Sequence, residues 1–479
     1  MDERMASPPA DDGISDAPGP VLAVLREIHQ RHRADASGTV ASYIPELATA
    51  DPALFGIALA TADGHLYAVG DAGDCFTIQS ISKPLVYGLA LADHGRAFVL
   101  GKVGVEPSGE AFNSIVFDER TNRPFNPMVN AGAIATTALI RGDGLAARFA
   151  RVRALLSAFA GRELAMDERV FHSERETGHR NRAIAWLERH FGMIDARIDE
   201  HLDLYFQQCA VLVTARDLAV MAATLANAGR NPVTGRQVLA PEHVRDVLSV
   251  MHSCGMYDYA GEWSFSVGLP AKSGVGGGII AVLPGQLGIG TFSPPLDDRG
   301  NSHRGIRVCE ELSDRFDLHV FAVHPPPAVI RQQYRDDEGR FRRQRNAEEC
   351  AALAGRGNDI AVYELQGDLY FATVERLLRA VQAECSAFTF LVLDGRRVGR
   401  IDGSARRLLA MLRDELAMSD KLLLLAGFSD EAAALLQPDE GWPADSFFAS
   451  AEAALTWCED RLIAAASDGC AGTAGSTRA

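Results

Sequence analysis

Two serines and a lysine precede a proline in QSISKP, residues 79–84. Proline is tolerated only in the first turn of a helix, so a helix carrying the following LVYGLALAD must begin just before Pro84, and Gly95 provides its stop. Ser80 then lies at or beside the helix N-terminus, where free N–H groups and the helix dipole stabilise negative charge. Lys83 follows Ser80 by three residues, so one helical turn places both side chains on one face. This spacing is that of a serine nucleophile with a lysine base.

The same spacing also fits a capping serine followed by a surface lysine, with Ser82 facing elsewhere. A serine hydroxyl attacks only when a base takes its proton, and a lysine can do so only when it is neutral. At an ordinary pKa of about 10.4, neutralising Lys83 at pH 7 costs roughly 4.6 kcal/mol. Catalysis therefore requires burial or a neighbouring positive charge that lowers the pKa of Lys83.

A second group of candidate residues lies far downstream in GLPAKSGVGGGIIAVLPGQLGIGTFS, residues 268–293. Its glycines have neither the G-x-G-x-x-G spacing of a dinucleotide loop nor the GK[ST] ending of a phosphate loop. Lys272, Ser273 and Gly274 lead into a strand, a Pro-Gly turn and another strand, which resembles the Lys-Ser/Thr-Gly element of serine β-lactamases and penicillin-binding proteins. Such a strand edge lines one wall of the cleft, and its backbone N–H can join that of the serine in an oxyanion hole. The middle S-D-N or Y-x-N element is missing, which disfavours β-lactam hydrolysis.

Longer segments carry a more specific resemblance. Residues from about 22 to 315 are similar to the serine-dependent glutaminases, through segments that follow in the order of that family. These segments are ASYIPELA, QSISKPL, NPMVNAGAI, SERETGHRN, LDLYFQQC, VMAATLANAGRNPVTG, VLSVMHSCGMYDYAG and VGLPAKSGVGGGI. The resemblance implies an α+β, β-lactamase-like domain: an antiparallel sheet with helices on both sides and a helical subdomain. It also implies hydrolysis of L-glutamine to L-glutamate and ammonia through a γ-glutamyl-serine acyl-enzyme, without a metal or an organic cofactor, in a homo-oligomer (dimer or tetramer).

The resemblance assigns roles residue by residue. It implies Ser80 as nucleophile, Lys83 as base, Tyr257 as proton relay and the backbone N–H of Val275 in the oxyanion hole. The substrate-binding residues that it implies are Tyr43, Ser80, Asn130, Glu174, Asn181, Tyr205, Tyr257 and Val275. The secondary wall of the cleft is Lys272, Ser273 and Gly274. Glu174 suits the substrate ammonium as a counter-charge, while the asparagines and tyrosines suit its carboxylate and amide.

A cysteine offers a rival nucleophile. Cys254 lies close to His252 in MHSCGMY, and a thiol can perform amide transfer when a base activates it. Residues so close in sequence rarely face each other, and no third orienting group is evident. The serine is therefore the preferred nucleophile.

The length of 479 residues favours two domains. We expect a disordered N-terminus over 1–19, with an amphipathic helix beginning at VLAVLREIHQRH, and the glutaminase-like domain over 20–323. A strand-like LHVFAV should stop at the triple proline, and a linker with some helix should cover 324–356. Its six arginines between Arg331 and Arg345 suit a solvated connection or a docking patch. A second domain should cover 357–465, followed by a flexible tail over 466–479.

The second domain alternates strands and helices, which is typical of a small α/β layer structure. IAVYELQGDLYFATVERLLRAV predicts a strand, a Gly-Asp turn and a helix; FTFLVLDGRRVGRIDGSARRLLAMLRDEL predicts a buried strand, a loop and a helix; and KLLLLAGF predicts a further strand. ELQGDLYFATVERL, LVLDGRRV and IDGSARRLL resemble STAS domains, which implies a protein partner or a small ligand. Some STAS relatives are phosphorylated at the serine that corresponds to Ser404, which follows an Asp-Ser dipeptide in them. Here the dipeptide before Ser404 is Asp402-Gly403, with glycine in place of serine. Asp402 or Ser404 also fits a helix cap.

Composition narrows the function classes. A formal charge of −16 disfavours nucleic acid and anionic membranes as partners. Eight scattered cysteines, no apolar leader, no membrane-length apolar run and no metal-binding spacing favour a cytoplasmic protein with free thiols and no metal. Two functions fit: a glutaminase with a regulating STAS domain, or a catalytically silent glutaminase fold that binds or signals through STAS. The intact Ser80, Lys83, Tyr257 and Lys272 favour the first.

Overall fold

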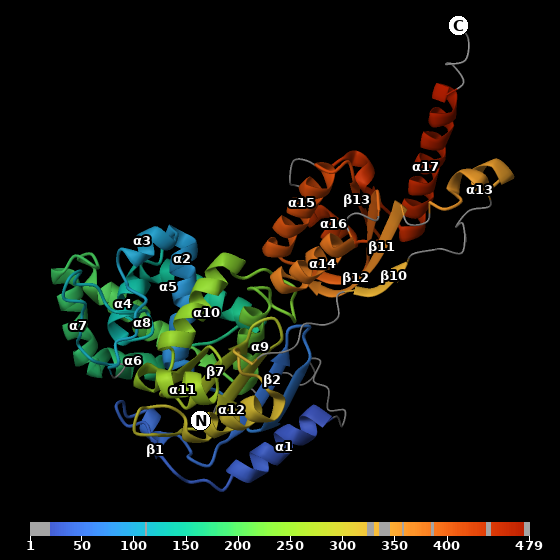
Figure 1. The fold of residues 1–479 in the computed structure, drawn as a ribbon. Coiled ribbons are helices and arrows are strands. Elements are labelled where there is room, and N and C mark those ends of the chain that lie inside the picture. The colour runs from blue at the N-terminus through green and yellow to red at the C-terminus, as the bar shows by residue number, and fades with distance from the viewer. Residues whose placement is uncertain are drawn as a thin grey trace. The chain divides into compact units, whose positions relative to one another are not determined.

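The computed structural model describes residues 20–110, 113–322, 330–334, 345–356, 359–384, 388–436 and 442–473. The chain divides into two compact units, Met1–Ala322 and Val323–Ala479, which are described separately (Figure 1). The expected disorder of residues 1–19 falls outside the described residues.

A five-stranded antiparallel sheet forms the centre of the first unit, in the order β3-β2-β8-β7-β6. Its strands are β2 (Gly56–Thr61), β3 (Leu66–Gly70), β6 (Ala271–Gly274), β7 (Gly278–Leu283) and β8 (Leu287–Phe292). Pro284 and Gly285 form the turn between β7 and β8, as the sequence predicts. β6 is an edge strand, so the Lys-Ser-Gly triplet lies at the border of the sheet.

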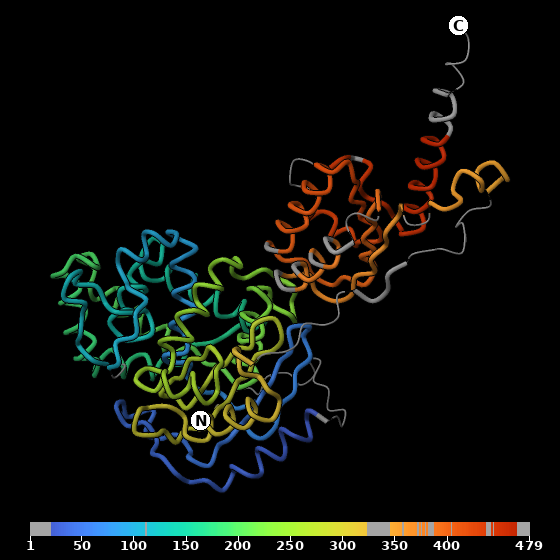
Figure 2. The backbone as a smooth tube through the Cα atoms, in the orientation of Figure 1, coloured from blue at the N-terminus to red at the C-terminus, as the bar shows by residue number. Residues whose placement is uncertain are grey.

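Helices cover both faces of this sheet. α9 (Ala215–Ala226) packs on one face, while α1 (Pro20–His32) and α12 (His303–Phe316) pack side by side on the other (Figures 1 and 2). Alternation along β2 divides its side chains: Ala58 and Ala60 belong to the core under α9, and Ile57 and Leu59 to the core under α1 and α12. Small side chains therefore line the side where α9 comes close.

The remaining elements of the first unit are the helices of the helical subdomain and several short segments. Its other helices are α2 (Ser82–His94), α3 (Arg96–Leu100), α4 (Asn130–Ala138), α5 (Gly144–Ala160), α6 (Glu168–Thr177), α7 (His179–His190), α8 (Ile198–Cys209), α10 (Pro241–Cys254) and α11 (Ala260–Ser266). Short 3-10 helices are η1 (Leu47–Thr49), η2 (Gln79–Ile81) and η3 (Tyr257–Tyr259). Two short pairs complete it: β1 (Thr39–Val40) with β9 (Pro295–Leu296), and β4 (Phe76–Thr77) with β5 (Leu212–Val213). This architecture confirms the predicted fold class.

The second unit is a five-stranded sheet in the order β10-β11-β12-β13-β14, parallel except for β10. The strands are β10 (Ile330–Tyr334), β11 (Ile360–Leu369), β12 (Phe390–Ile401), β13 (Leu422–Ala426) and β14 (Phe447–Phe448). On one face lie α14 (Phe371–Glu384), α15 (Gly403–Ala417) and α16 (Asp430–Leu436); on the other lie α13 (Ala347–Leu353) and α17 (Ala451–Thr473). η6 (Ala444–Ser446) precedes β14. The predicted α/β layer structure is confirmed.

Several local predictions are wrong. Residues 318–322, from the expected strand LHVFAV, form no strand, because Ala322 N bonds to His319 O in a turn. The Gly-Asp pair at 367–368 is no turn: Gly367 has φ +88° at an irregularity in β11, and the strand continues. The expected loop after LVLD is also strand, since β12 pairs with β11 as far as Ile401.

Some elements of the second unit lie outside the segment expected for its domain. α13 is the helix expected within the linker, whereas β10 also lies there and α17 reaches Thr473 in the expected tail. Asp402 caps α15, since its Oδ1 accepts a hydrogen bond from Ala405 N at 2.7 Å. The capping interpretation of Asp402 is therefore confirmed.

Candidate active site

Ser80 lies in η2, immediately before α2, and α2 carries Pro84 in its first turn and ends at Gly95. The Ser80 residue is 6% exposed. The preceding Gln79 has φ +50°, a left-handed conformation that residues with a Cβ rarely adopt. The Ser82 hydroxyl donates to Gln79 O at 2.7 Å and accepts from Gln208 Nε2 at 3.2 Å, so it is occupied away from Ser80.

Lys83 is buried in the first turn of α2. Its Nζ donates to Asn130 Oδ1 at 2.7 Å and to Met128 O at 3.2 Å. Burial lowers the pKa of Lys83 to about 7, against the opposing effects of Cys209 and Glu174. The burial that lysine-assisted catalysis requires is therefore present.

Tyr257 connects Ser80 to β6. Its pKa is raised by burial, an effect that hydrogen bonds to Ser80 and Ser273 oppose. The phenol donates to Ser273 O at 3.3 Å. Like Gln79, Tyr257 has a positive φ, of +57°.

A second buried lysine faces the Tyr257 ring. Lys272 Nζ lies 3.7 Å from the ring centroid and donates to Ser273 O at 2.5 Å, while Lys83 Nζ lies 5.9 Å from the same centroid. Burial and the charge of Lys83 lower the pKa of Lys272 well below its ordinary value. Burial and the repulsion between their charges disfavour having both lysines protonated.

The end of β6 packs against the segment that carries Ser80. A Cβ on Gly274 would lie 3.0 Å from Ile78 O, so glycine permits the close approach. Val275 follows directly and is buried. The Ser273 hydroxyl bonds to Asn301 Oδ1, so it is the Ser273 carbonyl that contacts Tyr257.

Asn130, the first residue of α4, joins residues of three helices. Its Oδ1 accepts from Lys83 and, at 3.3 Å, from the Tyr205 hydroxyl of α8. Its Nδ2 donates to Asn181 Oδ1 of α7 at 2.9 Å. Asn130, Asn181 and Tyr205, predicted from separate segments, therefore lie together beside Lys83.

Glu174 of α6 is 4% exposed, and the Tyr43 hydroxyl donates to its Oε1 at 2.6 Å. Burial raises the pKa of Glu174, although hydrogen bonds from Tyr43 and Gln79 and the charge of Lys83 oppose that rise. A buried carboxylate with neutral partners is suited to a ligand ammonium.

Family models match both units: a model described as Glutaminase matches residues 38–321, and a STAS domain model matches residues 353–438. Glutaminase 2 of Bradyrhizobium diazoefficiens is 50% identical over 452 residues, covering 93% of this chain and 72% of that protein. The chain belongs to the glutaminase family. The glutaminase of Trichormus variabilis is 60% identical over 304 residues, covering 64% of this chain and 91% of that protein.

Glutaminase structures agree with this assignment. The crystal structure of Mglu in its glutamate form has a TM-score of 0.77 and 36% identity, covering 89% of this chain and all of that one, at 100%. This chain is therefore a glutaminase with a β-lactamase-like catalytic domain, and its second unit contains a STAS domain.

The glutaminase site also contains residues that the sequence analysis missed. Gln79 Oε1 lies 2.9 Å from the Tyr43 hydroxyl, and Cys209 is buried near Lys83 and Tyr205. Asn301 holds the Ser273 hydroxyl. Gln79 stands directly before Ser80 in the sequence, whereas nothing local distinguishes Cys209 or Asn301.

The rival thiol in this glutaminase is separated from its expected base. Cys254 Sγ lies 3.2 Å from Ser253 Oγ, whereas His252 Nε2 lies 3.2 Å from Ser264 Oγ. Burial raises the pKa of Cys254 to about 11, which keeps it a thiol at neutral pH. This geometry favours Ser80 over Cys254.

The described parts of the chain contain no group of three or more His, Cys, Asp or Glu side chains that could hold a metal ion. None of the helices in these parts is long and apolar enough to cross a membrane.

Proposed function

We propose that this glutaminase hydrolyses the side-chain amide of L-glutamine through a γ-glutamyl ester on Ser80. The observation that carries the proposal is the buried contact between Ser80 and Tyr257, whose ring faces two lysines of lowered pKa. Because the pKa of Lys83 is about 7, a large fraction of its amine is neutral near neutral pH and can accept a proton.

Acylation begins when Ser80 Oγ attacks the amide carbon. Since Tyr257 contacts Ser80 while Lys83 Nζ bonds to Asn130 and Met128, we assign Tyr257 the relay of the serine proton. Lys83 is the base: its neutral amine accepts a proton from Tyr257, so that Tyr257 can take the proton of Ser80. The C–N bond then breaks, its nitrogen takes the proton and ammonia leaves.

In deacylation water is the attacking group and Ser80 Oγ is the leaving group. Water adds to the ester carbon, the ester C–O bond breaks, and the proton returns to Ser80 Oγ as glutamate leaves. In both steps the backbone N–H groups of Ser80 and Val275 hold the oxyanion, where one such donor is worth about 2.7–4 kcal/mol. The close packing of Gly274 against Ile78 supports this pairing.

Polar side chains of the first unit hold the two ends of the substrate. We assign Glu174 to the α-ammonium, and Tyr43, Asn130, Asn181 and Tyr205 to the carboxylate and amide. Lys272, Ser273 and Gly274 form the secondary wall. Support comes from the hydrogen bonds that already join Glu174 to Tyr43, and Asn130 to Asn181 and Tyr205.

The decisive experiment measures ammonia and glutamate release from L-glutamine by the full-length protein, with L-asparagine alongside. Ser80→Ala should lower the rate by about a thousandfold or more, because the ester cannot form. Ser82→Ala, which removes only a structural hydroxyl, is the matched control. A folded Ser80→Ala variant with substantial turnover would contradict the acyl-enzyme.

The STAS domain is proposed to regulate the glutaminase or to bind a partner. The competing function, a silent glutaminase fold acting through STAS, would show itself as no release from a folded wild-type protein. We also propose a homo-oligomer, dimer or tetramer, which light scattering would test. The described cysteines are free thiols, which supports a reducing compartment such as the cytoplasm.

A further inference from the structure

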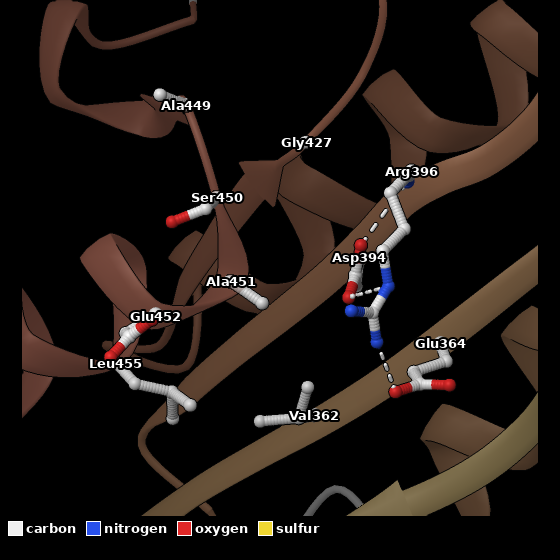
Figure 3. Close-up of a pocket in the computed structure, with 10 residues that line it drawn as sticks. All are labelled: Val362, Glu364, Asp394, Arg396, Gly427, Ala449, Ser450, Ala451, Glu452 and Leu455. Carbon is white, nitrogen blue, oxygen red and sulfur yellow. Dashed lines mark hydrogen bonds and ion pairs between the residues drawn. The ribbon is translucent and has the colours of Figure 1, made fainter. Parts of the chain in front are cut away.

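A cavity of about 310 Å³ lies within the second unit, between the sheet and the beginning of α17 (Figure 3). Its volume is at the lower end of the range for small-molecule sites. Glu364, Asp394 and Arg396 occupy one side in the figure, and Ser450, Ala451, Glu452 and Leu455 occupy the other. Nothing in the proposed glutaminase chemistry uses this cavity.

The sheet side presents two buried carboxylates. Glu364 and Asp394 are register partners in β11 and β12, and are 6% and 2% exposed. Adjacent carboxylates repel each other unless a cation lies between them. Arg396 provides one, with Nε 3.1 Å from Asp394 Oδ2 and a terminal nitrogen 2.5 Å from Glu364 Oε1. The Arg396 side chain is 55% exposed, and a second guanidinium, that of Arg397, lies 3.7 Å from Glu364 Oε2. Glu364, Asp394 and Arg396 all line the cavity.

The opposite side is the start of α17. Ser450 caps this helix, because its hydroxyl accepts from Ala453 N at 3.2 Å and its carbonyl from Ala454 N at 3.2 Å. The first N–H groups of a helix have no partner within it, and the dipole there favours negative charge. The guanidinium of Arg396 carries five N–H donors, more than its two carboxylate contacts use. These groups suit a carboxylate.

Apolar side chains complete the lining. Val362 contributes from the sheet, and Ala451 and Leu455 contribute from α17. The charged side chains that line the cavity are three carboxylates, of Glu364, Asp394 and Glu452, and one guanidinium, of Arg396. Such a lining disfavours phosphates and other net anions.

We propose that this cavity binds a small zwitterion of the neutral α-amino-acid class. The ammonium lies against Glu364 and Asp394, and the carboxylate lies between Arg396 and the start of α17. The site stands on the cavity and on two charged side chains buried by more than nine-tenths. It concerns the second unit alone, so it does not depend on what Ser80 does.

Equilibrium dialysis of radiolabelled L-glutamine tests this site. The full-length Ser80→Ala chain is compared with the same chain that also carries Asp394→Asn, and with a matched control carrying Glu431→Gln, an exposed carboxylate of α16. Asp394→Asn should remove about one bound equivalent per chain or weaken its Kd at least tenfold, and Glu431→Gln should change nothing. The difference is independent of any binding in the first unit, so a failure of the proposed catalytic site leaves the result readable.

Competition identifies the ligand class. Unlabelled L-alanine should displace the label from this site, whereas ethylamine, acetate and inorganic phosphate, which carry one charged group type each, should not do so at equal concentration. If Asp394→Asn disturbs folding by circular dichroism, Ala451→Leu fills the cavity without changing charge and should have the same effect. Equal binding in folded cavity variants, or equal displacement by ethylamine or phosphate, would overturn the proposal.

Discussion

Burial and mutual charge determine the protonation of the two lysines that face the Tyr257 ring. Lys272 Nζ lies 3.7 Å from the ring centroid and Lys83 Nζ 5.9 Å from it. Burial disfavours the charged form of each lysine, and the charge of Lys83 further lowers the pKa of Lys272. The Lys83 amine, with its pKa lowered to about 7, can therefore exchange protons near neutral pH.

The first residue-scale prediction concerns pH. Protonated Lys83 cannot accept a proton, and its pKa is lowered to about 7, so kcat/KM should rise as pH increases through about 7. The pH-rate profile with L-glutamine measures this rise. Lys102→Met, which removes a surface lysine bonded to Gly192 O, should leave the profile unchanged. A flat profile through neutral pH would contradict the role of Lys83 as base.

The second residue-scale prediction concerns the relay. Tyr257→Phe keeps the ring but removes the hydroxyl that contacts Ser80, so kcat should fall by about 10²–10⁴-fold with little change in KM. The neighbouring Tyr259→Phe is the matched control. An increase in KM at constant kcat would instead assign Tyr257 to binding.

At the scale of elements, close packing of α9 on the sheet depends on glycines in β8. A Cβ on Gly290 would lie 2.2 Å from Ala215 O of α9, and one on Gly288 would lie 2.3 Å from Ala223 N. Both obstructions are backbone atoms, which cannot rotate away as a side chain could. The sheet can therefore accept α9 at this distance only with glycine at these positions.

We expect Gly290→Ala to destabilise the first unit by about 1–3 kcal/mol, as overpacking of a close-packed core does. Urea unfolding with a probe of the first unit measures the loss. Gly73→Ala is the control, since a Cβ there meets nothing within 4 Å. Equal stability of the two variants would show that α9 shifts without cost.

At the scale of the whole molecule, every residue assigned to glutamine hydrolysis lies in the first unit. That unit has its own cores, and the Trichormus variabilis glutaminase matches only 64% of this chain while 91% of its own length is covered. A glutaminase therefore does not require the full length of this chain.

We accordingly expect a chain ending at Ala322 to retain glutaminase activity within about tenfold of the full-length rate, because no catalytic group is removed. Ammonia release measures it, and circular dichroism checks the fold. An inactive but folded chain would show that the second unit is required for activity.

Local sequence determined much of this protein. Pro84 and Gly95 set the ends of α2, the Lys-Ser-Gly triplet marked an edge strand, and the apolar runs of the second unit became its central strands, because these features depend on neighbours within one element. The family segments carried the candidate residues and the fold class. Gly367 is different, because the sequence predicts a turn there. A glycine with positive φ suits a turn and a strand irregularity equally well, and β11 contains the irregularity.

Only the tertiary structure decided which groups meet. Lys83 bonds to Asn130, 47 residues away, and Tyr257 reaches Ser80 from another element. Gln79 and Cys209 lie near these residues, although the sequence did not predict a role for either. The lowered pKa of Lys83 likewise follows from burial, which depends on helices distant in sequence. Hydrogen bonding and desolvation depend on what surrounds a side chain in space, and one sequence does not specify those surroundings locally.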